Sequence, residues 1–359
     1  MVSNNKGKTR RLISGLVAAI SLSTALAGAA FGADEDRLRG LVEAISAKEP
    51  FKIGVTVVHV QDDFWKGIAY GIADEAKRSN VEVLPVYVAG GYGNVKEQFG
   101  QLDTLNSLGA DVIVLGPAAY SGFNPVLKRL KEGGATVVAA GIPVDSPNVD
   151  FGIAQADGEI GRAQADSICA DAGANNVTAL VIPGPAGAEW ARLRLVAFAE
   201  RIKEKCPNVA IIDGPPTSST SIESGLAQAS DMLLKHPDIT YIETPVNTLG
   251  MGAVQAARQA GRKDVKVLAS GVVREELPMI EKGEMLAVGS EPGIIMGRLI
   301  VQYAIRQKEG LPMEGLTTEG SAYPAFMVPV TMITKENVAS YAYDLYEFVP
   351  ADWSITSIK

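Results

Sequence analysis

Short runs of apolar residues alternate with longer amphipathic stretches over most of the chain. The run FKIGVTVVH at 51–59 has the length and β-branched content of a buried strand. The stretch after it places Trp65, Ile68, Ile72 and Ala76 at the three- and four-residue spacing of a helix with one apolar face. The pattern recurs. It predicts strands at 51–59, 81–88, 112–115, 136–140, 177–182, 209–212, 239–243, 265–269 and 285–288, and helices at 65–79, 95–108, 124–132, 158–172, 189–205, 221–235, 249–260, 275–282 and 292–307.

This alternation predicts an α/β fold of two doubly wound lobes, each a parallel sheet with helices on both faces. No low-complexity linker separates the two series, so the lobes should be joined by a hinge of several short crossovers, near 146–155 and 290–291. A last apolar run at 325–333 should re-enter a sheet. The expected first lobe is 33–149 plus about 292–324, and the expected second lobe is 150–291 plus about 325–359.

The N-terminal residues have the pattern of a secretory signal peptide. Basic residues precede residue 12, an apolar run covers 16–30, and the small residues Ala30 and Gly32 stand before an acidic segment. We expect export and cleavage near Gly32. The apolar run is short for a membrane span, although an uncleaved anchor is the alternative. The pair Arg10-Arg11 leaves the general secretory and twin-arginine routes both open.

The composition excludes several classes of function. The formal net charge is −8, whereas a broad nucleic-acid surface needs clustered positive charge, so we expect no nucleic-acid partner. The chain has two His and two Cys and no G-x-S-x-G, H-E-x-x-H or C-x-x-C motif. We therefore expect no metal, no cofactor and no enzymatic activity. His59 and His236 are interpreted as structural residues.

Both cysteines lie near the C-terminal ends of predicted helices that flank a single predicted strand. Cys169 belongs to the helix at 158–172, and Cys206 follows the helix at 189–205. An exported protein with an even number of cysteines favours a disulfide between them. Two buried free thiols are the alternative.

The segment Asp62-Asp63-Phe64-Trp65 opens the first predicted helix and is a candidate ligand site. In open α/β sheets, ligands bind beyond the carboxyl ends of the strands, and this segment follows such an end. One of the two aspartates is a plausible helix N-cap. Phe64 and Trp65 offer aromatic faces on which a sugar ring or a small cation stacks, although Trp65 is equally compatible with a core position.

Other strand ends carry further candidates for binding a ligand. Tyr92 lies in the glycine-rich turn AGGYG, which allows the ring to be exposed. Arg194, on the helix at 189–205, has a planar set of donors that suits a polar ligand, and Trp190 precedes it. The remaining polar candidates at strand ends are Asp157, Asn247, Ser270 and Glu291.

Four segments resemble the type I periplasmic binding proteins, the superfamily of ribose-binding proteins and Lac-repressor-like domains. They are DDFWKGIAYG at 62–71, GADVIVLGP at 109–117, ARLRL at 191–195 and KHPDI at 235–239. The resemblance implies a ligand held between two lobes in the periplasm. By the match of motifs, Asp62, Phe64 and Trp65 correspond to the polar and aromatic sugar-holding residues of ribose binders, and Arg194 to their hydroxyl-binding arginine.

The chain departs from ribose binders at three places. Gly141-Ile142 replaces an Asp-Arg pair, Val246-Asn247 replaces an Asn-Asp pair, and Ser270 replaces an aspartate. The glycine-rich turn AGGYG and the segments PGP at 183–185 and AIRQ at 304–307 look most similar to the TorT-type subgroup.

The resemblance implies two functions. The first is a monomeric binding protein that delivers a small polar solute, a sugar or polyol, to the membrane permease of an ABC importer. The alternative is a TorT-like sensor that binds a small methylamine oxide or a related solute and partners a membrane histidine kinase.

Overall fold

The computed structural model describes residues 37–318 and 321–355. The helices and strands formed by these described residues lie in a compact unit that begins at Ile45. The expected signal peptide and its cleavage site near Gly32 lie outside the described residues. Within the described part of the chain, none of the helices has the length and the apolar composition that crossing a membrane requires.

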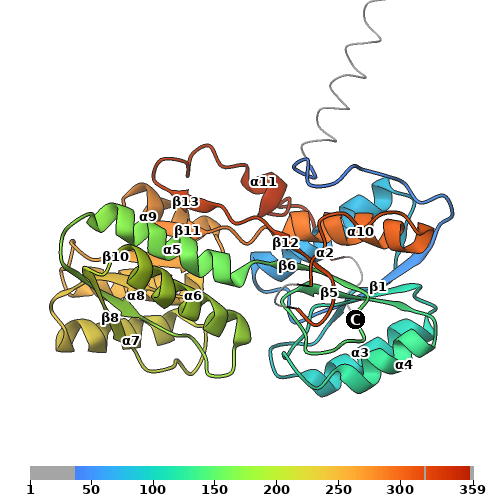
Figure 1. Ribbon diagram of the computed structural model, residues 1–359, viewed down its shortest axis with the longest axis horizontal. Coiled ribbons are helices and arrows are strands. Elements are labelled where there is room, and N and C mark those ends of the chain that lie inside the picture. Colours follow the sequence, from blue (N-terminus) through green and yellow to red (C-terminus); the bar gives the residue numbers. More distant parts are fainter. Residues whose placement is uncertain (1–36, 319–320, 356–359) are drawn as a thin grey trace, which may run out of the picture. The chain divides into compact units, whose positions relative to one another are not determined.

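The first sheet joins strands from two separate stretches of the chain, β1 to β6 and β12 (Figure 1). Its strand order is β12-β6-β5-β4-β1-β2, with β3 also paired to β1, and the pairings are parallel. These strands and the helices α2, α3, α4 and α10 form what we call the first lobe. The strands are β1 (Lys52–Val57), β2 (Glu82–Val83), β3 (Tyr87–Val88), β4 (Val112–Leu115), β5 (Thr136–Gly141), β6 (Phe151–Gln155) and β12 (Ala325–Val328). The helices are α2 (Asp63–Arg78), α3 (Val95–Ser107), α4 (Asn124–Glu132) and α10 (Gly293–Glu309).

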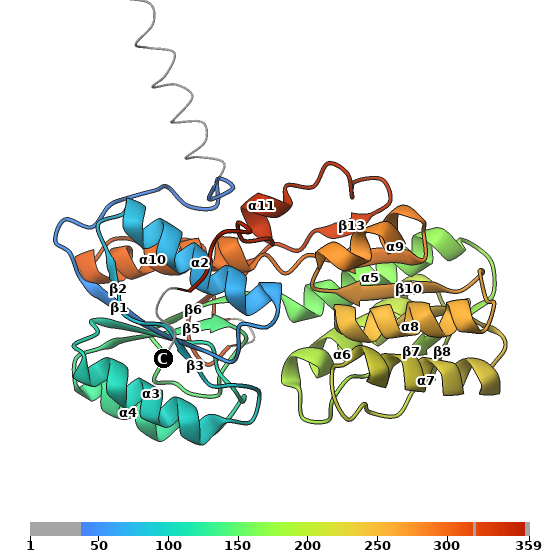
Figure 2. The same cartoon turned by 180° about the vertical axis from the view of Figure 1, so that it is seen from behind.

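The second sheet has the order β13-β11-β10-β9-β7-β8, and only the edge strand β13 is antiparallel (Figure 2). With its helices it forms the second lobe. The strands are β7 (Val177–Val181), β8 (Val209–Asp213), β9 (Ile239–Glu243), β10 (Lys266–Ser270), β11 (Met285–Gly289) and β13 (Met332–Thr334). The helices are α5 (Asp157–Ala172), α6 (Glu189–Lys205), α7 (Ile222–Lys235), α8 (Asn247–Gln259), the 3₁₀ turn η1 (Arg274–Glu276) and α9 (Leu277–Glu281), and a short α11 (Tyr343–Tyr346) follows β13.

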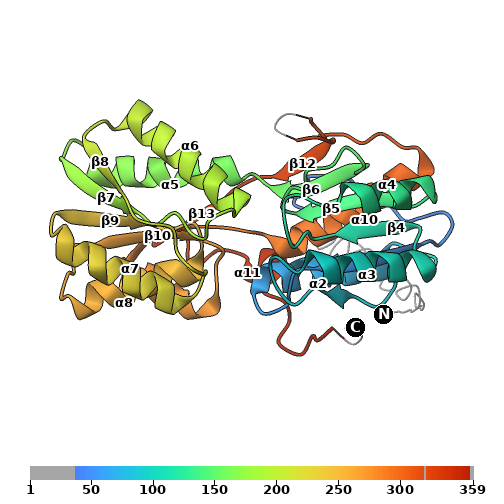
Figure 3. The ribbon, with the colours of Figure 1, turned by 90° about the horizontal axis from the view of Figure 1, so that it is seen from below.

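Each sheet is buried between two layers of helices, as the alternating pattern predicts. In the first lobe α2 and α10 cover one face, and α3 and α4 the other (Figure 1). In the second lobe α5 and α6 pack on one face, and α7 and α8 on the opposite face (Figure 3). The fold is therefore the expected α/β fold of two doubly wound lobes.

Two strands lie in a different lobe from the one that the sequence pattern suggested. β6, which we expected to be a crossover and the start of the second lobe, pairs with β5 in the first sheet. The run at 325–333 forms two strands: β12 pairs with β6 in the first sheet, and β13 pairs with β11 in the second. Pro329 follows β12 and lacks the N–H that a continuing ladder needs, so the chain changes sheets there. The chain thus crosses between the lobes after β6, after β11 and after β12.

The sulfur atoms of Cys169 and Cys206 form a disulfide, with Cα atoms 5.6 Å apart. Cys169 lies in the last turn of α5, and Cys206 is the C-cap of α6. The bond therefore ties together the ends of the two helices that cover one face of the second sheet, and the predicted pairing is confirmed.

Helices α2 and α10 touch backbone to backbone through glycines. A Cβ atom at Gly71 would lie 2.1 Å from the carbonyl oxygen of Ile294, and one at Gly297 would lie 2.3 Å from the carbonyl oxygen of Ile68. Because no side chain intervenes, the two helices approach more closely than side chains normally allow. This contact sets the position of the N-terminus of α2 relative to that of α10.

We predict that Gly71→Ala destabilises the protein by about 1–3 kcal/mol, because the added methyl group forces α2 and α10 apart. Gly100→Ala is the matched control, since it adds the same methyl group within α3 but meets nothing within 4 Å. It should stabilise the protein by about 0.5–1 kcal/mol, because alanine favours the helix. Urea unfolding of the two variants measures both effects, and equal stability of the two would contradict the importance of the contact.

Candidate functional site

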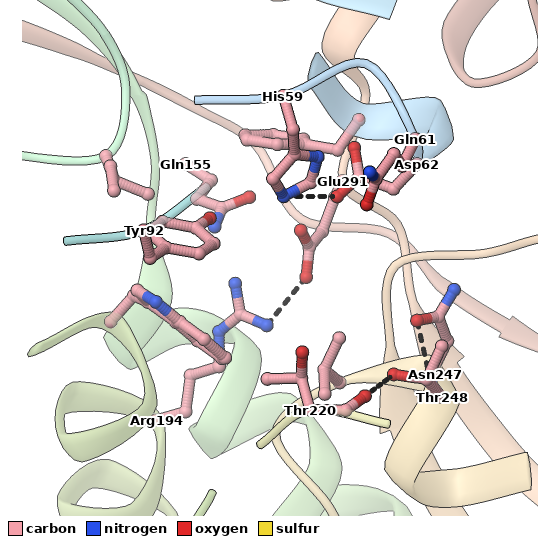
Figure 4. A pocket seen from close by; sticks show the side chains of 14 residues that line it. His59, Gln61, Asp62, Tyr92, Gln155, Arg194, Thr220, Asn247, Thr248 and Glu291 are labelled. Atoms are coloured by element: carbon pink, nitrogen blue, oxygen red, sulfur yellow. Dashed lines mark hydrogen bonds and ion pairs between the residues drawn. The ribbon is translucent and has the colours of Figure 1, made fainter. Parts of the chain in front are cut away.

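A cavity of about 270 Å³ is formed at the carboxyl ends of strands from both lobes (Figure 4). The first lobe contributes the segment after β1, the turn after β3 and the ends of β5 and β6. The second lobe contributes α6, the loop before α7 and the start of α8, and Glu291 lies on the crossover before α10. The lining residues are His59, Gln61, Asp62, Phe64, Tyr92, Ile142, Gln155, Trp190, Arg194, Thr220, Val246, Asn247, Thr248 and Glu291.

Arg194 is buried and its guanidinium group is bonded to four protein groups. Nε donates to Oδ1 of Asp157 at 2.9 Å, and Nη2 lies 2.8 Å from the same oxygen. Nη1 donates to Oε1 of Glu291 at 2.6 Å, to the carbonyl oxygen of Pro245 at 2.6 Å and to the hydroxyl of Ser270. These bonds hold the guanidinium in one orientation at the wall of the cavity.

This network contains more negative than positive charge. Burial disfavours the ionised form of Asp157 and raises its pKa to about 6, although Arg194 opposes the shift. Burial alone would lower the pKa of Arg194, but Glu291 and Asp157 more than offset it and raise the pKa, so the arginine stays protonated. Near neutral pH, one cation therefore faces two carboxylates.

Three aromatic side chains complete the wall of the cavity. Phe64 meets the ring of Trp65 edge-on, with ring centroids 5.0 Å apart. The hydroxyl oxygen of Tyr92 accepts a hydrogen bond from Nε1 of Trp65 at 3.2 Å. The guanidinium carbon of Arg194 lies 5.1 Å from the ring centroid of Trp190. Such rings suit the apolar faces of a sugar or a small cation.

Most of the candidate residues from the sequence come together at this cavity. Those that line it are Asp62, Phe64, Tyr92, Trp190, Arg194, Asn247 and Glu291. Asp157 and Ser270 are buried behind the wall and bond to Arg194. The start of α2 thus places Asp62 in the wall, where its Oδ1 also caps the helix by accepting from the backbone N–H of Trp65.

Asp63 and Trp65 are not part of the lining. The carboxylate of Asp63 lies 3.5 Å from Nζ of Lys66 on the same helix. Trp65 is fully buried, and a Cβ atom at Gly116 would meet its ring at 2.4 Å. Of the two positions open to Trp65, the structure shows the core one, in which the ring supports Tyr92 from behind.

Several lining residues were not singled out in the sequence, although all lie at strand ends. They are His59, Gln61, Ile142, Gln155, Thr220, Val246 and Thr248. Gln155 was missed because the pattern did not reveal β6 as a strand. His59 was interpreted as structural, but its Nε2 lies 3.6 Å from Oδ2 of Asp62 at the cavity.

A second cavity of about 510 Å³ adjoins the first and shares the residues Tyr92, Ile142, Trp190 and Thr220 with it. Its wall is made largely of small and apolar residues, from the loop at 118–121 in the first lobe and the segment at 185–190 in the second. The charged groups described above therefore belong to the first cavity alone, which is the better candidate for binding a polar solute. Within residues 37–318 and 321–355, no cluster of three or more His, Cys, Asp or Glu could hold a metal ion.

Known proteins are similar to this chain in sequence and in structure. The family model described as "Periplasmic binding protein domain" matches residues 53–312. A solved sugar ABC transport system substrate-binding protein from Bordetella parapertussis is 50% identical, with a TM-score of 0.83 over 89% of this chain and 100% of the other. The periplasmic protein TorT of Escherichia coli is 25% identical over 74% of this chain and 75% of its own length. A xylitol-binding protein of Mycolicibacterium smegmatis is 22% identical over 80% of this chain and 78% of its own length.

A buried carboxyl group behind the site makes stability depend on pH. Glu243 ends β9, and its Oε1 has no hydrogen-bond partner among the described residues. Burial raises its pKa to about 8, and the positive charge of Arg194 reduces the shift. The folded protein thus retains a proton that the unfolded chain releases near pH 4.5. This contribution to stability is complete below pH 4.5 and is lost as the pH rises through about 8.

We predict that the free energy of unfolding of the unmodified protein falls as the pH is raised from about 5 to 8.5. In the variant Glu243→Gln the free energy of unfolding should fall less steeply over the same range. Glutamine has the shape of the protonated carboxyl group but releases no proton. Glu200→Gln, an exposed position on α6, is the control and should keep the slope of the unmodified protein. Urea unfolding over this pH range measures the slopes, and an unchanged slope in Glu243→Gln would refute the assignment.

Proposed function

The chain belongs to the periplasmic binding protein domain family, and we propose that it captures a small polar solute, a sugar or polyol, for the permease of an ABC importer. The observation that carries the proposal is the composition of the first cavity. Aromatic rings and hydrogen-bonding groups from both lobes line the same space, as in sites that stack a sugar ring and bond its hydroxyls. Two relatives are named for binding a transported substrate or xylitol, so we propose that this protein binds its solute without turning it over.

The topology supports a hinge mechanism. Three crossovers connect the two sheets, and the C-terminal segment returns to the first lobe, where Trp353 contacts Tyr70 of α2. The cavity lies where the lobes face each other. A solute that contacts both lobes binds the closed form more tightly and shifts the population toward it. Closure then presents a surface that a permease can distinguish from the empty form. We propose that the lobes move as two bodies about these segments and that the protein works as a monomer.

The names of similar proteins support the choice of solute. The Bordetella protein, at 50% identity, is a substrate-binding protein of a sugar ABC transport system, and a more distant relative binds xylitol. The family description and the periplasmic protein TorT support a periplasmic location after export. Selectivity follows from the buried network, because an analogue that lacks a bonding group leaves a buried partner unsatisfied.

A sensor role is the second candidate, and the similarity to TorT favours it. In this case the closed form would dock on a membrane histidine kinase rather than on a permease. The cavity would be used in the same way, and only the partner would differ. Deleting the gene distinguishes the two: loss of solute uptake supports the importer, whereas intact uptake with loss of a transcriptional response supports the sensor.

We predict that a thermal-shift screen identifies a sugar or polyol that stabilises the protein, by about 2.7 kcal/mol at a concentration of 100 times its Kd. Trp190→Ala should weaken binding of that solute at least about tenfold, because it removes one aromatic wall. Trp353→Ala is the control, since this tryptophan contacts Tyr70 and does not line the cavity. Isothermal titration calorimetry measures the affinities. If no sugar, polyol or amine derivative of either binds, the proposed function is wrong.

A further inference from the structure

Resting on the proposed function, we propose that the solute is a cation: a polyol or sugar that carries an ammonium group, recognised by the carboxylates of Asp62 and Glu291. Both carboxylates line the first cavity. Asp62 comes from the start of α2 in the first lobe, and Glu291 from the crossover that follows β11. Figure 4 shows the two side chains around the same space as Arg194.

The charge balance of the cavity carries this inference. Arg194 shares its charge between Asp157 and Glu291, at 2.8 and 2.6 Å. One guanidinium cannot neutralise two carboxylates, and Asp62 adds a third. The side chain of Lys66 lies 3.5 Å from Asp63 and does not line the cavity. His59 also lines the cavity, with its Nε2 3.6 Å from Oδ2 of Asp62, but even a protonated His59 would leave two cations against three carboxylates. The site therefore holds an excess of negative charge, which is costly to enclose unless the ligand brings a positive charge.

An unsatisfied acceptor points in the same direction. Gln155 is 5% exposed and lines the cavity, and its Oε1 has no hydrogen-bond partner among the described residues. Its Nε2 donates to Oδ1 of Asp157 at 3.1 Å, and a carboxylate accepts only from the amide nitrogen, which fixes the orientation of the group. Together with the two carboxylates, this oxygen makes a set of acceptors that requires donors from the ligand. An ammonium group has donors and no acceptor.

The aromatic wall suits a cation as well. One aromatic ring, that of Trp190, is already engaged with the guanidinium of Arg194. Phe64 and Tyr92 also line the cavity and offer ring surfaces that attract an ammonium group or the C–H groups beside it. Oδ1 of Asn247 accepts a hydrogen bond from the backbone N–H of Thr248. The amide nitrogen of Asn247 can therefore donate to a hydroxyl of the ligand. The cavity thus combines groups for a cation with a group for a polyol.

A neutral sugar would satisfy part of this site. Its hydroxyls can donate to Asp62, Glu291 and Gln155, but they leave the excess charge uncompensated when the lobes close around it. The difference in affinity between a neutral solute and its amine therefore distinguishes the two ligand classes. It can be measured on pairs of compounds that differ in a single group.

The test is isothermal titration calorimetry at pH 7 and low salt with three matched pairs: sorbitol and N-methylglucamine, glucose and glucosamine, galactose and galactosamine. We expect the protonated amine to bind at least about tenfold more tightly than its neutral counterpart in at least one pair. Raising the salt concentration should reduce that preference, because the interaction is between charges. If the neutral compound of every pair binds as tightly as the amine or more tightly, the inference is overturned and the proposed function stands. If none of the six compounds binds, the inference fails, and the thermal-shift screen described above decides separately on the proposed function.

Asp62→Asn tests the assigned carboxylate. Asparagine caps helices as well as aspartate does, so α2 should keep its N-cap and the fold its stability. We expect the variant to lose most of the preference for the amine while its affinity for the neutral counterpart changes by less than about threefold. Asp103→Asn makes the same change of charge on the exposed surface of α3, at an aspartate paired with Arg129, and should keep the preference. An unchanged preference in Asp62→Asn would overturn the role of Asp62.

Discussion

The buried guanidinium of Arg194 is the interaction on which the site depends. It joins the first turn of α5, the loop after β9, the end of β10 and the crossover before α10, through Asp157, Pro245, Ser270 and Glu291. Four chain segments are thus fixed by one side chain. Desolvating this charge is tolerable because carboxylates face it, and removing the guanidinium would leave the buried carboxylates of Asp157 and Glu291 without a cationic partner. The same bonds that hold the second lobe together therefore define one wall of the cavity.

In the first lobe, close packing of helices rather than an ionic network fixes the position of the residues at the cavity. Gly71 and Gly297 let α2 and α10 meet backbone to backbone. Asp62 stands at the N-terminus of α2, and Glu291 stands just before α10. A contact between two helix backbones, remote from any ligand, thereby sets the separation of the two carboxylates that face the cavity. Replacing either glycine changes the site without touching a residue that lines it.

Periodicity in the sequence was enough to predict the two lobes, because a buried strand and an amphipathic helix each leave a distinct pattern. It failed where a strand's identity depends on its neighbours: β6 shows no alternation, and β12 and β13 lie in one apolar run that is divided between two sheets. For the site, position at a strand end was informative, and it brought most of the candidates to the cavity. It could not decide whether Trp65 faces the ligand or the core, because a strand end does not show which side chains pack around the first turn of α2, where Trp65 is buried. Gln155 was missed for the same reason as β6.

The excess negative charge has a consequence for the hinge as well as for selectivity. Asp62 belongs to the first lobe, and Asp157 and Arg194 belong to the second, with Glu291 on the segment that joins them. On the proposed hinge mechanism, closing the lobes without a ligand brings like charges together in a less polar space and raises the free energy of the closed form. A cation between the carboxylates makes the electrostatic contribution to closing favourable instead of unfavourable. A ligand shifts an equilibrium only by its difference in affinity between the two forms. On the proposed ligand class, the same charge imbalance that selects the solute also keeps the empty lobes apart, so recognition and closure would depend on one electrostatic term.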